Sequence, residues 1–244
     1  MNDSEGNNLF ATLYVSKGQS IPNITSDRSE DYIPAETRIV VIGVPEPVDL
    51  GLSVKWASFN VGATTPEEYG DYFAWGETEP KTDYSWSTYK WCNGNFNKLT
   101  KYCLGDQSYY WNGEGTPDGK TVLDPEDDPA ITNWGGTWRT PTDDEWTELR
   151  NKCTWTWTSQ NGVIGYLITA TNGNSIFLPA AGYRDGSALK YTGAGGLYWS
   201  SSLHPKDSSQ AWGVHLNSYY VSRVRNDRRL GVSVRPVECK ALNY

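Results

Sequence analysis

The sequence predicts an α+β fold in which few helices and many short, twisted antiparallel strands are joined by long irregular loops. Two observations carry this prediction. The composition is rich in turn formers and amphipathic aromatics, with 24 Gly, 13 Pro, 12 Trp and 16 Tyr but only 5 Phe and 1 Met. The apolar residues also recur mostly at every second position, which is the period of a half-buried strand.

Short alternating runs dominate the second half of the chain. Strands are predicted at residues 155–158, 165–170, 175–179, 197–201, 210–216 and 231–235. Asn172-Gly173 separates the second of these runs from the third and is a strong hairpin signal. A further strand is expected where Leu50, Leu52, Val54 and Trp56 alternate with smaller or polar residues.

One helix is predicted over residues 139–150. Thr140 or Thr142 can cap its start, Pro141 suits an early helical position, and acidic residues 143–145 favour the positive end of the helix dipole. Trp146 and Leu149 are three residues apart and should face the core together. A second helix near residues 65–68 would end within a turn or two at Gly70.

The chain divides into residues 1–46 and 47–244. The first part holds two strand-like runs, 9–15 and 37–44, and is too short to bury a sufficient core alone. We interpret it as a short N-terminal β segment or the end of an assembly module. The Pro45-Glu46-Pro47 break leads into the second part, which is expected to form one domain.

The net charge is −8, with −14 in residues 1–150 and +6 in residues 151–244. This balance argues against nucleic-acid binding, although the basic C-terminal part could attract an acidic partner or simply balance the acidic part. No run is long and apolar enough to span a bilayer. The polar start, Met1 to Glu5, lacks a signal peptide, and we expect an exported mature segment without its leader.

Four cysteines and two histidines limit the metal and disulfide chemistry. Without a Cys-x-x-Cys pair, a zinc site is not expected. Cys92 and Cys103 are close enough in sequence to close one loop, and Cys153 and Cys239 could then form a second disulfide. The sequence leaves all three pairings open.

Five motifs occur in order along the chain: LGLSVKWA at 50–57, WGGTWRTPT at 134–142 followed by Glu145-Trp146, LPAAGYR at 178–184, YWSSS at 198–202 and GVSVRPV at 231–237. In this order they resemble the major paralogous domain named for Fibrobacter succinogenes, which is common in Bacteroidetes surface proteins. The resemblance covers residues 48–238.

The resemblance implies a C-type-lectin-like fold, related to formylglycine-generating enzymes and to the variable receptor proteins of diversity-generating retroelements. Members are mostly lipoproteins or secreted proteins, and similar domains occur at the tips of Bacteroidales pili. Binding or adhesion at the cell surface is therefore expected. Arg139 and Arg235 belong to the motifs, and we expect structural ion pairs there.

Enzymatic and metal-dependent activities are not expected. An oxidase similar to formylglycine-generating enzyme needs a late pair of cysteines, whereas only Cys239 is available. Calcium-dependent sugar binding needs converging oxygens, but Glu79-Pro80 is followed by Lys81, and Asn226-Asp227 lacks a preceding Trp. The acidic run 124–128 is interpreted as a solvated turn rather than a metal loop. We expect no cofactor, no metal and no catalytic residue.

The predicted binding site lies between residues 204 and 229, where two loops, 204–209 and 217–229, flank a buried strand. Its Tyr, Asn, Ser and Arg composition is that of a paratope. The candidate ligand-binding residues are His204, Lys206, Asp207, Asn217, Tyr219, Tyr220, Ser222, Arg223, Arg225, Asn226, Asp227 and Arg228. The arginines, Arg229 included, could clamp an anion, or could simply be ordinary solvent-facing residues of a strand.

A second aromatic stretch leaves two interpretations open. Its rings could form a stacking platform for sugars or could pack on one another within a long loop; they are Trp86, Tyr89, Trp91, Tyr109, Tyr110 and Trp111. The function predicted overall is a non-enzymatic ligand-binding or adhesion module of a bacterial surface. The ligand would be a protein or a glycan, and it could be acidic. A pilus-tip or assembly subunit is the first alternative, and an oxidase the second.

Overall fold

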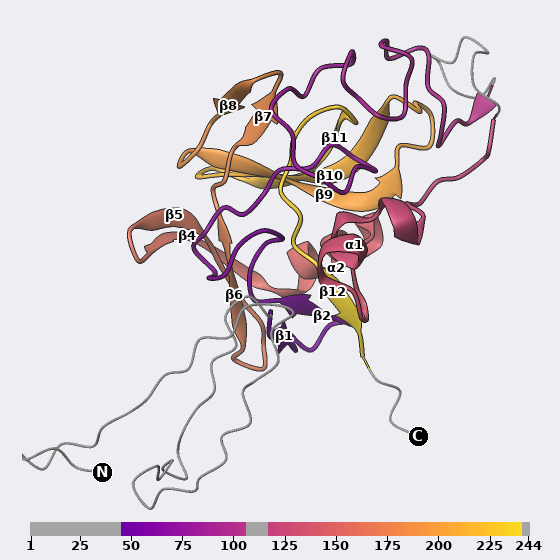
Figure 1. Cartoon of the computed structure of the whole chain (residues 1–244). Helices are drawn as coiled ribbons and strands as arrows, with labels where there is room; N and C mark the ends of the chain where they lie inside the picture. The colour runs from indigo at the N-terminus through magenta and orange to yellow at the C-terminus, as the bar shows by residue number, and fades with distance from the viewer. Residues whose placement is uncertain (1–44, 106–116, 241–244) are drawn as a thin grey trace, which may run out of the picture. The chain divides into compact units, whose positions relative to one another are not determined.

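The computed structural model describes residues 45–105 and 117–240. Contacts divide the chain into residues 1–44 and 45–244. The predicted strands at 9–15 and 37–44 lie outside the described residues, as do Tyr109, Tyr110 and Trp111. In the described part, strands outnumber helices and long loops join them, as an α+β fold requires (Figure 1).

Four antiparallel sheets and two α-helices make up the fold of the described residues. The first sheet has the order β1-β2-β12-β3, the second β11-β10-β9, the third β4-β5-β6 and the fourth β7-β8. The strand bounds are β1 Pro47–Val48, β2 Val54–Ala57, β3 Trp138–Arg139, β4 Thr154–Gln160, β5 Val163–Thr169, β6 Ser175–Pro179, β7 Tyr183–Asp185, β8 Ala188–Lys190, β9 Gly195–Leu203, β10 Gln210–Asn217, β11 Val221–Asp227 and β12 Val237–Cys239. The helices are α1 Pro129–Trp134 and α2 Asp143–Lys152, and a 3₁₀ turn, η2, spans Pro125–Asp127.

Two of the sequence predictions for strands were wrong. The predicted loop 217–229 contains β11, which pairs with β10 over its whole length. Its exposed Arg223 and Arg225 alternate with the half-buried Ser222, Val224 and Asn226, a two-residue period that was passed over because the paratope-like composition suggested a loop. The predicted strand 231–235 instead makes isolated bridges, from Gly231 to Arg184 and from Val232 to Phe73. Residues 231–235 are buried at every position, and apolar residues such as Val232 and Val234 suggested a strand there.

Helix α2 confirms Thr142 as the cap and the acidic first turn, but it begins at Asp143 rather than at residue 139. Thr142 is the N-cap: its hydroxyl accepts a hydrogen bond from the Glu145 amide, and the Glu145 carboxylate accepts one from the Thr142 amide at 2.8 Å. Pro141 precedes the cap and is not helical. Trp146 and Leu149 are buried, and the indole of Trp146 donates to the Trp199 carbonyl at 3.0 Å. This contact fixes α2 against β9. Residues 65–68 form a turn and no helix.

Of the two motif arginines, Arg139 forms the predicted ion pair with Glu145. The prediction for Arg235 was wrong. Arg235 is fully buried and has no carboxylate partner among the described residues, because its guanidinium donates to the carbonyls of Ala57 and Phe177 and to the amide oxygen of Asn60. Burial lowers the pKa of Arg235 to about 10. The residue holds β2 and β6 together through backbone acceptors.

Glu145 gives a pH prediction. Burial acts to raise the pKa of its carboxyl, but the bonds from Arg139 and from Thr142 outweigh burial and lower that pKa. A lowered folded-state pKa stabilises the fold above the unfolded value, about 4.3, and this stability is lost as the pH falls through the folded pKa. We expect Glu145→Gln to destabilise at pH 7 and to lose this effect progressively as the pH falls below about 4.3. Urea unfolding over a series of pH values measures this, and a pH-independent effect would contradict it.

The cysteine prediction does not agree with the structure. Cys92, Cys103, Cys153 and Cys239 are all free thiols in it, so neither predicted disulfide is formed. Cys103 is buried, and burial raises the pKa of its thiol to about 11. Cys92 instead makes a 3.0 Å contact from its Sγ to the Trp86 carbonyl, and Cys239 lies exposed on β12.

The acidic run 124–128 is not the solvated turn that was expected. Asp127 and Asp128 are buried, and each has a separate structural role. Asp127 accepts hydrogen bonds from Lys101 at 2.6 Å and from the Tyr102 hydroxyl at 2.7 Å. Asp128 caps α1 and accepts from the Thr140 hydroxyl at 2.7 Å. None of the described residues form a cluster suited to a metal ion, and none of their helices is long and apolar enough to cross a membrane.

Candidate functional site

The β10–β11 strand pair has two faces, and each borders a separate cavity. Directly opposite residues of an antiparallel pair share a face, and successive residues alternate between faces. Trp212 lies opposite Arg225, which places both on one face. His215 lies opposite Ser222, and Asn226 opposite Ala211, so these lie on the other face. The predicted site residues are therefore split between two surfaces.

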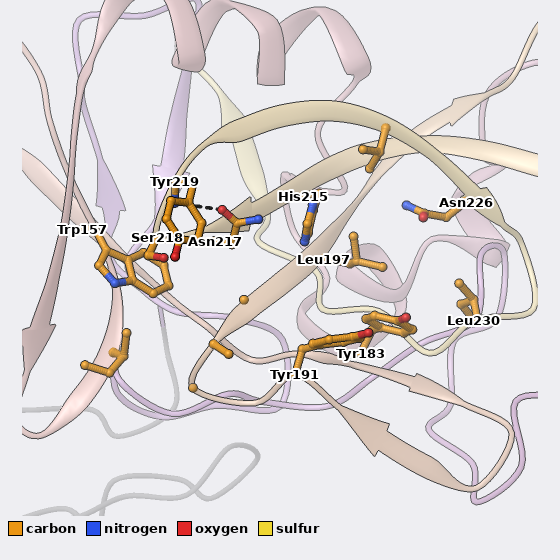
Figure 2. A pocket seen from close by; sticks show the side chains of 15 residues that line it. Trp157, Tyr183, Tyr191, Leu197, His215, Asn217, Ser218, Tyr219, Asn226 and Leu230 are labelled. Carbon is orange, nitrogen blue, oxygen red and sulfur yellow. Dashed lines mark hydrogen bonds between the residues drawn. The ribbon is translucent and has the colours of Figure 1, made fainter.

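The first cavity, which we name the aromatic cavity, has a volume of about 780 Å³. It lies between the His215 face of the β9-β10-β11 sheet, the β7–β8 hairpin with the turn that follows it, and the β4–β5 hairpin (Figures 1 and 2). Its lining residues are Trp157, Ile164, Tyr183, Tyr191, Gly193, Ala194, Gly195, Leu197, His215, Asn217, Ser218, Tyr219, Val224, Asn226 and Leu230. No formally charged side chain belongs to this set.

Aromatic rings occupy both ends of this cavity. Tyr183 and Tyr191 stack with ring centroids 5.8 Å apart and planes inclined by 25°. Trp157 and Tyr219 lie at the opposite end from Leu230 (Figure 2). Tyr191 is 65% exposed and Tyr219 is 91% exposed, which is unusual for large rings in the absence of a partner. These rings offer broad apolar faces to anything that enters the cavity.

Tyr191 is also held in a strained backbone conformation. Its φ of 60° lies in the left-handed region, which costs a non-glycine residue roughly 1–2 kcal/mol. The two residues that follow, Thr192 and Gly193, complete a turn in which the Tyr191 carbonyl accepts hydrogen bonds from the amides of Ala194 and Gly195. The turn thus fixes an exposed ring at the cavity mouth at an energetic cost, which is typical of functional sites.

Polar groups in the cavity are few and well placed. The Asn217 side-chain oxygen accepts from the amides of Tyr219 and Tyr220 at 2.9 and 3.1 Å, so it shapes the β10–β11 turn. Burial lowers the pKa of His215, which keeps its imidazole neutral at pH 7. The Nδ2 group of Asn226 is buried and has no acceptor within residues 45–105 and 117–240. An unpaired amide of this kind costs about 1–3 kcal/mol, which a ligand acceptor could recover.

The second cavity, which we name the basic cavity, has a volume of about 580 Å³. Its lining residues are His204, Pro205, Lys206, Asp207, Gln210, Trp212 and Arg225. Arg223 lies beside it, with its guanidinium 3.4 Å from the centre of the Trp212 ring and bonded to Asp143 at 2.6 Å. The predicted residues 204–207 thus belong to a surface opposite the aromatic cavity.

Several predicted site residues do not line either cavity. Arg228 is the clearest correction, because it is fully buried and its guanidinium donates to the Tyr89 hydroxyl and to the carbonyls of Lys101 and Ser208. It cannot contact a ligand in this state. Tyr220, Ser222, Arg223 and Asp227 also lie outside both lining sets.

Sequence reasoning missed most of the aromatic cavity. Trp157, Tyr183 and Tyr191 come from strands and turns distant in sequence from residues 204–229, and no local pattern connects them. His215 was not among the predicted site residues. The one available signal was Gly193-Ala194-Gly195-Gly196, two residues after Tyr191, since such a glycine run permits close approach of the backbone.

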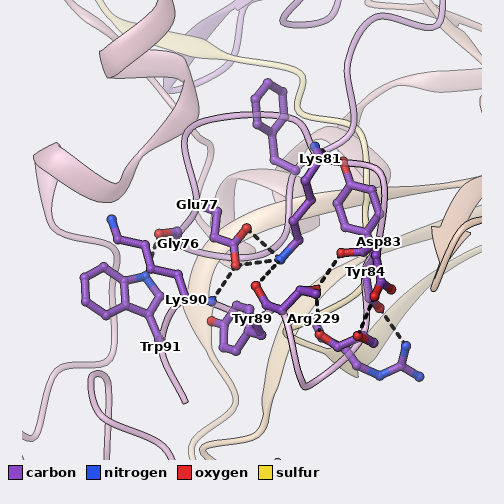
Figure 3. A network of polar contacts seen from close by, with 12 residues as sticks. Gly76, Glu77, Lys81, Asp83, Tyr84, Tyr89, Lys90, Trp91 and Arg229 are labelled. Carbon is purple, nitrogen blue, oxygen red and sulfur yellow. Dashed lines mark hydrogen bonds and ion pairs between the residues drawn. The ribbon is translucent and has the colours of Figure 1, made fainter. Parts of the chain in front are cut away.

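The described part of the second aromatic stretch, which we call the aromatic loop and which contains Trp86, Tyr89 and Trp91, packs on itself. Tyr89 is buried, its hydroxyl donates to the Trp75 carbonyl at 2.6 Å, and the Trp91 indole donates to the Gly76 carbonyl at 2.6 Å. Figure 3 shows Glu77 at the centre of this loop, where its carboxylate accepts from the Lys81 side chain at 2.9 Å and from the Lys90 amide at 2.7 Å. These contacts favour the packing interpretation over a stacking platform.

Arg229 connects the same loop to the β7–β8 hairpin. Its guanidinium donates to the Tyr84 carbonyl at 2.9 Å (Figure 3) and also to Asp185 at 2.6 Å. Asp185 pairs with Lys190 at 2.7 Å as well, which joins the two strands of the hairpin. Arg229 therefore anchors the hairpin that bears the Tyr183–Tyr191 stack to the aromatic loop.

A comparison with known protein families bears on the same region. Residues 148–237 match a domain of unknown function, DUF8237. The DUF8237 match includes every residue that lines the aromatic cavity and every residue that lines the basic cavity. No curated protein and no solved structure matches the chain. The DUF8237 description assigns no activity, so the site must be interpreted from its own chemistry.

Proposed function

We propose that the chain is a non-enzymatic ligand-binding module of a bacterial cell surface that binds a neutral sugar ring in the aromatic cavity. The single observation behind this proposal is the composition of the lining. Exposed aromatic rings surround neutral amide, hydroxyl and imidazole groups, and no formal charge is present among the lining residues. A pyranose has apolar C–H faces and hydroxyl edges, so it complements such a surface.

The five ordered motifs support a C-type-lectin-like architecture for this module. LPAAGYR contains Tyr183, which lines the cavity, and YWSSS lies on β9 in the sheet beneath it. Surface location and adhesion follow from the same resemblance. The binding proposed here uses hydrogen bonds and ring contacts, and it needs neither a metal ion nor a catalytic group.

Tyr191→Gly provides the most informative variant for a test. It removes the exposed ring and also relieves the left-handed strain, so the fold should be as stable as the wild type or slightly more stable. Loss of one ring contact, worth about 1–2 kcal/mol, should weaken glycan binding roughly five- to thirtyfold. A glycan array followed by calorimetry on the best neutral oligosaccharide measures the change.

Leu189→Ala is the matched control, because Leu189 is exposed on the same hairpin but does not line the cavity. Affinity should stay within about twofold of wild type for this variant, as expected of a surface change without a partner. The proposal fails if no neutral glycan binds, or if Tyr191→Gly binds the selected glycan as tightly as the wild type does.

A further inference from the structure

The basic cavity on the opposite face of the β10–β11 pair contains two cationic side chains without an ion-pair partner among the described residues. Lys206 and Arg225 are exposed, and within residues 45–105 and 117–240 neither side chain makes an ion pair or a hydrogen bond. Both are long side chains at the rim of one cavity, so they can converge on a group bound inside it.

The acids near this cavity are already engaged elsewhere. Asp207 is buried, and its Oδ1 accepts from the amide and the hydroxyl of Ser209 at 2.9 and 2.6 Å. Asp143 forms an ion pair with Arg223, and the Oδ2 atom of Asp227 lies 3.5 Å from the Nε atom of Arg229. Lys206 and Arg225 therefore form no ion pair with these acids, and the cavity lining, with Asp207 as its one carboxylate, keeps an excess of positive charge.

The imidazole of His204 adds a neutral donor. Its Nδ1 accepts from the Lys206 amide at 3.4 Å, so the proton of the neutral ring lies on Nε2. Burial, and then the positive charge of Arg225, lower the pKa of His204 and keep the ring neutral at pH 7. His204 therefore adds a hydrogen-bond donor to the cavity and no further charge.

The walls of this cavity favour a hydroxylated ligand over a hydrocarbon stem. The guanidinium of Arg223 covers one face of the Trp212 ring, 3.4 Å from its centre, and the ring of His204 meets it in a T-shaped contact at 4.8 Å, so the indole is partly occupied. The remaining side chains, apart from Pro205, carry hydrogen-bonding groups. The methylene groups of a glutamate side chain from a peptide ligand would find little apolar contact in this cavity. The hydroxyls of a sugar acid would instead meet hydrogen-bonding side chains.

We infer that the basic cavity is a second binding site, which takes the carboxylate of an acidic sugar between Arg225, Lys206 and His204. This inference extends the proposed function by naming a ligand class for the other face of the strand pair. It requires no binding in the aromatic cavity, so the two sites are tested separately.

Titration of the isotope-labelled full chain with D-glucuronate, followed by NMR, tests the inference. Glucuronate is expected to shift the Trp212 indole signal, and D-glucose is expected not to. Arg225→Gln should weaken glucuronate binding by about tenfold or more, since a charge-assisted bond of about 1.5–3 kcal/mol is lost, and Arg225→Lys should recover part of it. Raising the salt from about 0.05 to 0.5 M should weaken binding as well.

Tyr191→Gly is the matched control, because it alters the aromatic cavity alone and should leave glucuronate binding unchanged. The inference is overturned if glucuronate does not bind, if Arg225→Gln binds it as the wild type does, or if glutarate binds as tightly as glucuronate. The last outcome would indicate a site for acidic peptide side chains. Loss of neutral glycan binding with glucuronate binding intact would instead refute only the proposed function of the aromatic cavity.

Discussion

Arg228→Leu is expected to destabilise the fold by about 3–5 kcal/mol, the range found when one member of a buried charged network is removed. The guanidinium of Arg228 is fully buried, and it donates to the Ser208 carbonyl at 2.7 Å, to the Lys101 carbonyl at 3.0 Å and to the Tyr89 hydroxyl at 2.8 Å. Leucine would leave these acceptors buried without a donor.

The aromatic rings around Arg228 explain how the charge is tolerated without a carboxylate. The guanidinium carbon lies 5.0 Å from the centre of the Trp75 ring, 5.3 Å from that of Tyr89 and 5.5 Å from that of Tyr102. Ring faces and carbonyl dipoles both stabilise a cation. Since Tyr89 and Lys101 belong to the long aromatic loop, Arg228 also fixes that loop on the C-terminal segment.

Arg225→Gln is the control for Arg228→Leu, because Arg225 is an exposed arginine from the same stretch of chain. It should change the free energy of unfolding by no more than about 0.5 kcal/mol. Urea unfolding of both variants, followed by tryptophan fluorescence, measures the difference. Similar midpoints for the two variants would contradict the buried role of Arg228.

Gly182→Ala is expected to cost about 3–5 kcal/mol, the combined effect of a left-handed backbone and an overpacked contact. Gly182 has a φ of 68°, and a Cβ atom there would lie 2.1 Å from the Lys190 carbonyl oxygen and 2.9 Å from the Thr192 amide nitrogen. Both atoms are backbone, so neither can rotate away. The glycine therefore allows the chain entering β7 to approach the turn that carries Tyr191.

Gly173→Ala separates the two contributions. Gly173 has a φ of 86°, but a Cβ atom there would meet nothing within 4 Å. Only the left-handed conformation is penalised, and the expected cost is about 1–2 kcal/mol. Thermal and urea unfolding of the two variants gives the comparison. Equal destabilisation would mean that the close approach at Gly182 contributes nothing.

The sequence predicted those features that depend on local rules. The Thr142 cap of α2, the burial of Trp146 and Leu149, and the Asn172-Gly173 hairpin all follow from residues close together in the chain. β11 was missed because its composition suggested a loop, although the exposed Arg223 and Arg225 alternate with half-buried residues. Composition outweighed periodicity at that point, and the two-residue period was correct.

The candidate site was predicted only in part, because it is assembled from distant segments. Asn217, Tyr219 and Asn226 do line the aromatic cavity, whereas the rings of Tyr183 and Tyr191 reach it only through sheet packing. The residues 204–207 were grouped with them since they are near in sequence. The two-residue period of a strand separates such neighbours onto opposite faces, and only the register of β10 and β11 shows which face each occupies.

We propose that a neutral glycan binds in the aromatic cavity and not on the opposite face of the β10–β11 pair. Two indoles distinguish the faces, since Trp157 lines the aromatic cavity and Trp212 the basic one. The most direct measurement is an NMR titration of the labelled protein with the best neutral oligosaccharide from the array, with both indole signals assigned through Trp157→Phe and Trp212→Phe. We predict that the Trp157 signal shifts to saturation and that the Trp212 signal stays in place. A saturable shift of Trp212 without one of Trp157 would contradict the claim.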